Sequence, residues 1–334
     1  MCFRRALKGA VEPRNAVSGR NPSRSTISVT LIAVHCIFAL AVHAGQQAES
    51  KVGITPRVQP RGDRSTAANL RLDVKVILVP VSVTDAVDRP LIKLPVENFR
   101  VLEDGVEQKI TSFSQEDGPV SIGLLFDTSG SMKSRIDTSL EALKNLFQGS
   151  IPGDEFLLVR FSDQAQVLTG FTTSADEIYS KLGRVQPQGW TAMLDAIALG
   201  THHMRSARNS RKALLILSDG GDNNSRFSEA EIRGMVLESD VRVYAIGLFH
   251  RSHFLQQLAD ETGGRVFIAE NLKDLPDIVE KLSLEIRSQY MVGYVSSNPH
   301  NDGKYRKVKV EVAQPSGAKP VRISWRHGYY APDE

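Results

Sequence analysis

Cysteine is nearly absent from this chain. Its 334 residues include two cysteines, Cys2 and Cys36, and both lie within the first 44 residues. If that segment is removed on export, the mature protein can form no disulfide and no cysteine-ligated metal site. Export without disulfides is more typical of a bacterial envelope protein than of a eukaryotic extracellular domain.

The chain also lacks an excess of either charge. It holds 41 basic and 38 acidic residues, and residues 1–44 contribute six of the basic and one of the acidic residues. Residues 45–334 therefore hold 35 basic and 37 acidic residues. A nearly neutral chain offers no electrostatic basis for binding nucleic acid.

Common enzyme motifs are missing as well. The sequence has no Gly-x-Ser-x-Gly elbow, no Walker loop and no His-Glu-x-x-His motif. The pairs His202-His203 and His250-x-x-His253 lack the third and fourth ligands that zinc requires, so we interpret them as surface histidines. We expect a protein that is not an enzyme.

The N-terminus has the pattern of an export signal. A basic stretch precedes an apolar run from about Ile27 to Val42, and Val42-His43-Ala44 offers small residues suited to signal peptidase. The run is shorter than the ~20 residues of a comfortable membrane span, but an uncleaved anchor is the alternative. We predict a signal peptide or N-terminal anchor at 1–44, a flexible linker at 45–69, and a location in the periplasm, the cell envelope or outside the cell.

Residues 118–288 alternate between short apolar runs and amphipathic segments. This rhythm predicts an α/β domain with a doubly wound, mostly parallel sheet and helices on both faces. The segment 155–170 is typical of a hairpin that adds one antiparallel edge strand. Strands are expected at 120–126, 155–161, 166–170, 212–218, 241–247 and 265–268, and helices at 136–148, 174–184, 192–207, 228–239, 252–262 and 272–288.

The segments on either side, 70–117 and 289–334, have β patterns. In the first, Leu72, Val74 and Val76 alternate with polar residues in a run that continues to Val83, and Asp104-Gly105 marks a turn between strands at 99–102 and 108–113 that pair with each other. In the second, strands are expected at 290–295, 308–312 and 321–325. Because each segment is marginal alone, we expect them to pair into a small β-sandwich with the α/β domain inserted between them.

Oxygen-bearing side chains occupy three loops beside the expected sheet. Asp127-Thr128-Ser129-Gly130-Ser131 follows the apolar run 122–126, Thr191 precedes the expected helix at 192–207, and Asp219 ends the run 213–218. Ligands of such sheets bind beyond the carboxyl ends of the strands. Carboxylate and hydroxyl oxygens suit a hard cation such as Mg²⁺, and an acidic group on a partner could fill an open coordination position.

Several features near these loops allow two interpretations. Asp-x-Ser-x-Ser by itself is an ordinary turn pattern. The acidic loop 220–224 either borders the metal site and tunes its charge or is a simple turn. Trp190 either contacts a partner at the rim of the site or is buried under its loop.

The constellation of Asp127, Ser129, Ser131, Thr191 and Asp219 resembles the metal-ion-dependent adhesion site (MIDAS) of von Willebrand factor type A domains, and all five positions match. The resemblance covers about residues 118–288. It implies that Mg²⁺ or Mn²⁺ is coordinated directly by Ser129 and Ser131, directly or through water by Thr191, and mostly through water by the two aspartates. The flanking sequences 99–105, 290–294 and 327–330 resemble the secreted VWFA-related proteins of acidobacterial genomes.

Together these features predict an exported, non-enzymatic, adhesion-type module that binds a partner protein through Mg²⁺ and an Asp or Glu carboxylate of that partner. The first alternative is a structural component of the cell envelope whose metal only stabilises the fold. The second is a metal-dependent hydrolase, for which the sequence offers no general base beyond the ligands themselves.

Overall fold

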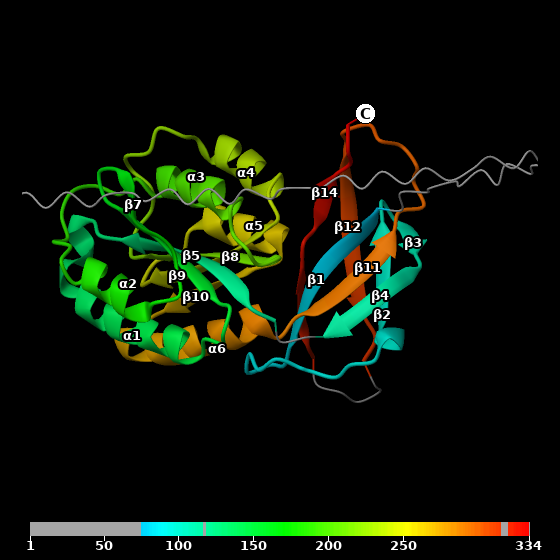
Figure 1. The fold of residues 1–334 in the computed structure, drawn as a ribbon, viewed down its shortest axis with the longest axis horizontal. Coiled ribbons are helices and arrows are strands. Elements are labelled where there is room, and N and C mark those ends of the chain that lie inside the picture. The colour runs from blue at the N-terminus through cyan, green and yellow to red at the C-terminus, as the bar shows by residue number, and fades with distance from the viewer. Residues whose placement is uncertain (1–74, 116–117, 315–319, 334) are drawn as a thin grey trace, which may run out of the picture. The chain divides into compact units, whose positions relative to one another are not determined.

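The computed structural model describes residues 75–115, 118–314 and 320–333 (Figure 1). The predicted signal or anchor at 1–44, the predicted linker at 45–69 and the start of the first predicted strand lie outside the described residues. The boundaries proposed for the flanking segments and the α/β domain stay predictions. The fold class is confirmed, since a mostly parallel sheet with helices is accompanied by antiparallel sheets.

The central sheet has six strands in the order β10-β9-β8-β5-β6-β7. All neighbours are parallel except β6 and β7, which form the antiparallel hairpin expected at this edge. From β5 the chain continues to β6 on one side and later to β8 on the other, so the strand order reverses between β5 and β8. Ligands of open α/β sheets bind at such a reversal. The strands are β5 (Val120–Asp127), β6 (Glu155–Phe161), β7 (Ala165–Thr172), β8 (Arg211–Ser218), β9 (Val241–Leu248) and β10 (Arg265–Ala269).

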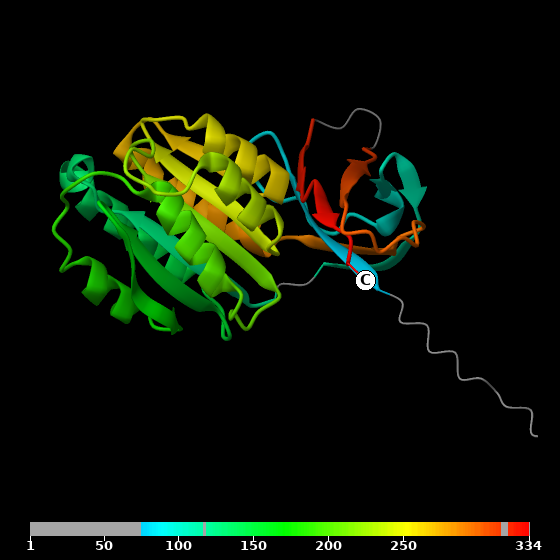
Figure 2. The same cartoon turned by 90° about the horizontal axis from the view of Figure 1, so that it is seen from above.

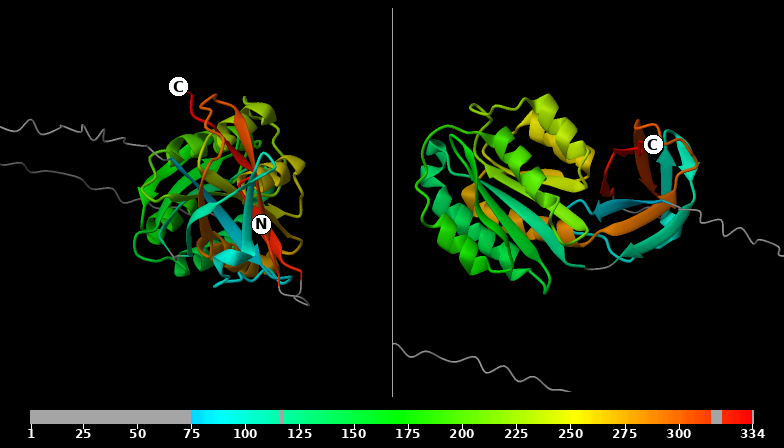
Figure 3. Two further views of the ribbon diagram at one scale, coloured as in Figure 1. Left: turned by 90° about the vertical axis from the view of Figure 1, so that its right-hand side faces the viewer. Right: turned by 45° about the horizontal axis from the view of Figure 1, so that its top comes forward.

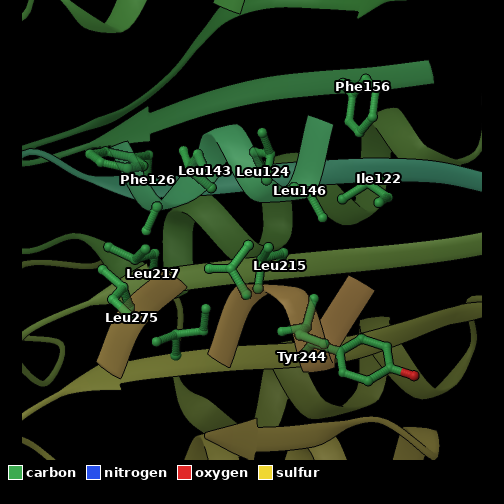
Figure 4. Packing of buried hydrophobic residues seen from close by; sticks show 14 of the residues in the cluster. Ile122, Leu124, Phe126, Leu143, Leu146, Phe156, Leu215, Leu217, Tyr244 and Leu275 are labelled. Carbon is green, nitrogen blue, oxygen red and sulfur yellow. The ribbon is translucent and has the colours of Figure 1, made fainter. Parts of the chain in front are cut away.

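Helices cover both faces of this sheet (Figures 1 and 2). The core on one face contains residues of α1, α2 and α6, and the core on the other contains residues of α3, α4 and α5. Figure 4 shows the first core, where Leu143 and Leu146 of α1 and Leu275 of α6 lie against side chains of the central strands. The helices are α1 (Ile136–Gln148), α2 (Ala175–Leu182), α3 (Met193–Met204), α4 (Glu229–Leu237), α5 (His253–Thr262) and α6 (Leu275–Arg287).

The flanking segments form two four-stranded antiparallel sheets, ordered β13-β1-β11-β4 and β14-β12-β2-β3. Their facing sides share one apolar core, which includes Val81, Val101, Tyr290 and Val310. Blue-to-cyan strands from before the α/β domain and orange-to-red strands from after it contribute to this region (Figure 3). The strands are β1 (Val76–Thr84), β2 (Phe99–Glu103), β3 (Val106–Gln108), β4 (Ile110–Gln115), β11 (Tyr290–Val295), β12 (Tyr305–Val312), β13 (Arg322–Trp325) and β14 (Gly328–Tyr330).

Three details of this β region differ from the sequence prediction. The strand expected at 108–113 is two strands, since β3 pairs with β2 but β4 pairs with β11 in the other sheet. Gln108, the last residue of β3, is buried. Its amide nitrogen donates to Ser297 Oγ at 2.8 Å and its amide oxygen accepts the Ser297 N–H at 2.9 Å, which fixes the point where the chain changes sheets. In β1 the buried apolar residues are Val79, Val81 and Val83, whereas Val76, which the sequence pattern placed on the buried face, is exposed. The strand β14 was not predicted at all.

Two helices of the α/β domain are preceded by short 3₁₀ segments. Gly130–Ser134 lies between β5 and α1, and Leu272–Asp274 precedes α6, so the last helix is shorter than the predicted 272–288. Among the helices of the described ranges, none combines the length and the apolar character needed to span a membrane.

Candidate metal site at the strand ends

Asp127 is the buried centre of the site. It ends β5, a strand whose eight residues are all buried. One carboxylate oxygen accepts the backbone N–H of Ser129 at 2.8 Å, and the other accepts the hydroxyl of Ser218, at the end of β8, at 2.5 Å. Burial raises the pKa of the Asp127 carboxyl, and the hydrogen bonds from Ser218 and Ser129 oppose that shift. The carboxylate therefore ties the loop after β5 to the neighbouring strand.

A chain of polar contacts continues from Ser129 to Asp219. The Oγ atoms of Ser129 and Ser131 lie 3.1 Å apart, and the Ser131 hydroxyl donates to Asp219 Oδ1 at 2.7 Å. The Asp219 side chain has no solvent exposure, and its Oδ2 receives no hydrogen bond. The structure thus brings four of the five predicted residues into one network, which joins the ends of β5 and β8.

Thr191 joins the same edge through the backbone of its loop. The Gly130 N–H donates to Gly189 O at 3.1 Å, which brings the loop before α3 against the loop after β5. The Thr191 N–H donates to Asn223 Oδ1 at 2.8 Å, and the Asn223 N–H donates back to Thr191 O at 3.0 Å. Thr191 is 5% exposed. Its two hydrogen bonds with Asn223 hold it against the loop that follows Asp219.

Gly189 has a structural reason to be glycine. Its φ is +83°, and a Cβ atom there would lie 2.3 Å from the Asp163 carboxylate. That carboxylate accepts the N–H of Trp190 at 2.7 Å. A side chain at position 189 would therefore displace the loop that carries Thr191. Asp163 and Asn223 were both missed as positioning residues, although Asp and Asn beside turn glycines are known to bind backbone N–H groups.

The acidic loop and Trp190 each allowed two interpretations from the sequence. In the acidic loop, Asp222 accepts the N–H of Leu194, in the first turn of α3, at 3.1 Å, and the hydroxyl of Ser225 at 2.5 Å. Its carboxylate therefore caps a helix. Trp190 is 64% exposed, which agrees with a position at the rim of the site and not with burial.

Sequence reasoning also missed Arg135, the cationic residue of the site. Its Nη1 forms an ion pair with Asp219 Oδ2 and donates to Ser131 O at 3.3 Å. Its guanidinium also lies over the Phe249 ring, 5.1 Å from the centroid. Phe249 has a φ of 62° and is 51% exposed. No periodicity or motif links positions 135, 219 and 249, because they come from three separate loops.

The donor atoms of the site fit a hard divalent cation. They are carboxylate and hydroxyl oxygens, and one of them, Asp219 Oδ2, is buried without a hydrogen bond. Within the described ranges no group of three or more His, Cys, Asp or Glu side chains could hold a metal. That these residues bind a metal stays a prediction.

The strands, helices and polar side chains together define an open α/β domain with a polar site where the strand order reverses. The model of the von Willebrand factor type A domain matches residues 122–221, and the chain therefore contains a domain of this family. Domains of this type typically mediate protein–protein interactions.

Solved structures resemble the chain at low sequence identity. They include a von Willebrand factor type A protein from Catenulispora acidiphila (13% identity, TM-score 0.48, covering 76% of this chain and 72% of that one) and BatB from Bacteroides thetaiotaomicron (16%, 0.41, 49% and 97%). Proximal thread matrix protein 1 from the mussel byssus is also similar (20%, 0.46, 55% and 51%). No curated protein matches the chain.

Proposed function

We propose that this protein is an exported, non-enzymatic binding module that holds Mg²⁺ or Mn²⁺ and, through it, an Asp or Glu carboxylate of a partner protein. Residues Asp127, Ser129, Ser131, Thr191 and Asp219 would hold the cation. Export is proposed from the basic and apolar pattern of residues 1–44, and membership of the VWFA-related secreted family from the flanking sequences. No nucleic-acid partner is proposed, because residues 45–334 are nearly neutral.

The observation that carries this proposal is the network from Asp127 through Ser129 and Ser131 to Asp219. A stable fold does not require two buried carboxylates and two hydroxyls at one edge of a sheet, because burying charge is unfavourable. Their convergence at the strand-order reversal supports a ligand there. Asp219 Oδ2 receives no hydrogen bond and lies against a positive group, the Arg135 guanidinium, which supports a cation as that ligand. When bound, the cation would supply a Lewis-acidic position for the partner's carboxylate.

We predict that divalent cations stabilise the protein. At about 100 times its Kd, Mg²⁺ adds about 2.7 kcal/mol by mass action, which raises Tm by roughly 5–10 °C for a domain of this size. Asp127→Asn and Asp219→Asn should lose the shift, measured by thermal melting with Mg²⁺ and with EDTA. Ser131→Ala should reduce the shift as well, whereas the matched control Ser134→Ala, at an exposed serine of the same 3₁₀ segment, should not. If Mg²⁺ shifts the Tm of the wild type and of both aspartate variants equally, the proposed metal site is wrong.

Binding of an acidic group is tested with two immobilised peptides that differ at one position. A peptide with a central Asp should retain the protein in Mg²⁺ and release it in EDTA, whereas the same peptide with Asn should not retain it. Ser131→Ala should abolish retention, and Ser134→Ala should not. If Mg²⁺ raises Tm but neither peptide binds, the cation has a purely structural role and the adhesion-type function is wrong.

A further inference from the structure

The candidate site already contains a positive group, the guanidinium of Arg135. Asp219 Oδ1 is occupied by the Ser131 hydroxyl, and the neighbouring Oδ2 faces the guanidinium of Arg135. The carboxylate is fully buried, whereas 28% of the Arg135 side chain is exposed. A buried carboxylate is unfavourable unless a positive charge lies beside it, so Arg135 balances Asp219 when no metal does.

We propose that Arg135 is an internal counter-ion that competes with the divalent cation for Asp219. This inference rests on the proposed metal site. A guanidinium against one carboxylate oxygen and a divalent cation held by the same carboxylate would repel each other strongly at short range in a partly buried site. The site therefore has two states, one with Arg135 on Asp219 and one with the metal in place and Arg135 withdrawn.

Arg135 can leave Asp219 without unfolding its surroundings. It lies between the 3₁₀ segment and α1, and its side chain is long and partly exposed. Nη1 of the guanidinium makes the ion pair with Asp219 Oδ2, and no buried hydrogen bond has to be broken for this side chain to turn toward solvent.

Phe249 gives the guanidinium a favourable contact that does not depend on Asp219. Arg135 already lies over its ring, and a cation over an aromatic face is favourable by about 0.5–1 kcal/mol at exposed sites. A bulky residue with a φ of 62° is a genuine outlier, and such residues concentrate at functional sites. The Phe249 N–H donates to Ala269 O at 3.0 Å, which fixes the backbone at this position.

Competition lowers the apparent affinity for the cation. Only molecules in which Arg135 has left Asp219 can bind it, so the measured Kd exceeds the intrinsic Kd by the inverse of their fraction. Arg135→Gln removes the competitor while retaining a polar side chain. We expect the Kd for Mg²⁺, measured by isothermal titration on the full chain at low salt, to fall about tenfold in this variant.

Two controls separate competition from bulk charge. Arg135→Lys keeps a positive charge near Asp219 and should bind Mg²⁺ with a Kd close to that of the wild type. Lys133→Gln removes an exposed charge two positions away in the 3₁₀ segment and should change the Kd much less than Arg135→Gln.

An NMR titration of the wild type tests the competition without the glutamine variant. The Nε–H signal of Arg135 is assigned in nitrogen-15 spectra by its loss in Arg135→Lys. We expect this signal to shift when Mg²⁺ is added.

The outcomes distinguish this inference from the proposed function. A lower Kd in Arg135→Gln, or Mg²⁺ binding that this variant alone shows, supports the competition. An equal or higher Kd in Arg135→Gln than in the wild type, or an Arg135 signal that Mg²⁺ does not move, overturns the competition and leaves the metal site in place. Absence of Mg²⁺ binding in every variant overturns both.

Discussion

Residues 289–334, produced alone, should stay unfolded, and so should residues 70–117. In the sheet β13-β1-β11-β4, no two neighbouring strands come from the same flanking segment. β1 pairs with β11 and β13, and β4 pairs with β11, so each segment by itself loses every ladder of that sheet. What remains are two-stranded pairs, β2 with β3 and β12 with β14, and such pairs are marginal in water. Far-UV circular dichroism and limited proteolysis of each fragment test this.

Residues 118–288 are the matched comparison, because they keep both helix-covered cores and all six strands of the parallel sheet. This fragment should unfold cooperatively in urea and keep helical circular dichroism. A protease-resistant core from 289–334 alone would contradict the interleaved pairing. Failure of 118–288 to fold would show that the α/β domain depends on the β region for its stability.

The sequence predicted the α/β domain well because its signals are local. The strands are buried on both faces and therefore read as continuous apolar runs, as in β5 and β8. The helices have one apolar stripe each, and α1 begins and ends where its pattern predicts. The alternation of strands and helices predicted a mostly parallel sheet covered on both faces, but the order of its strands came only from the structure.

The β region was predicted less well because pairing between distant segments leaves little local trace. Alternation over 108–113 is compatible with a single strand, and nothing local shows that the chain changes sheets after Gln108. That change is fixed by the bonds between Gln108 and Ser297, which are 189 positions apart. The buried side of β1 was misassigned for a related reason, since a shift of one residue exchanges the two faces of a strand.

At the candidate site, too, local features were predicted and contacts between distant segments were not. Its ligand types were predicted from residue chemistry, and the structure brings Asp127, Ser129, Ser131 and Asp219 into contact. Arg135 was not predicted, because its ion pair with Asp219 joins a loop after β5 to one after β8. A sequence shows which side chains could bind a cation, but it does not show which basic side chain of the protein pairs with them in the fold.

The joint between the α/β domain and the β region depends on one buried carboxylate. Asp154, 2% exposed, accepts the N–H of Val120, which begins β5, at 2.9 Å and the N–H of Ile151 at 2.8 Å. Arg287 completes the group with two hydrogen bonds, of 3.3 and 2.6 Å, to the same carboxylate. Arg287 ends α6, and β11 begins three residues later. The end of the last helix is therefore fixed to the start of the central strand.

Asp154→Ala should lower the free energy of unfolding by about 3–5 kcal/mol, because it leaves the largely buried Arg287 guanidinium without its counter-ion. Urea denaturation at pH 7 measures the loss. Adding Arg287→Met to this variant should recover part of it, since the stranded charge is then removed. The control is Glu107→Ala, which breaks an ion pair with Arg100 whose two side chains are 55% and 54% exposed and should leave stability nearly unchanged. If Asp154→Ala proves no more harmful than Glu107→Ala, the carboxylate is not what fixes the end of α6, and the backbone between α6 and β11 must hold the joint unaided.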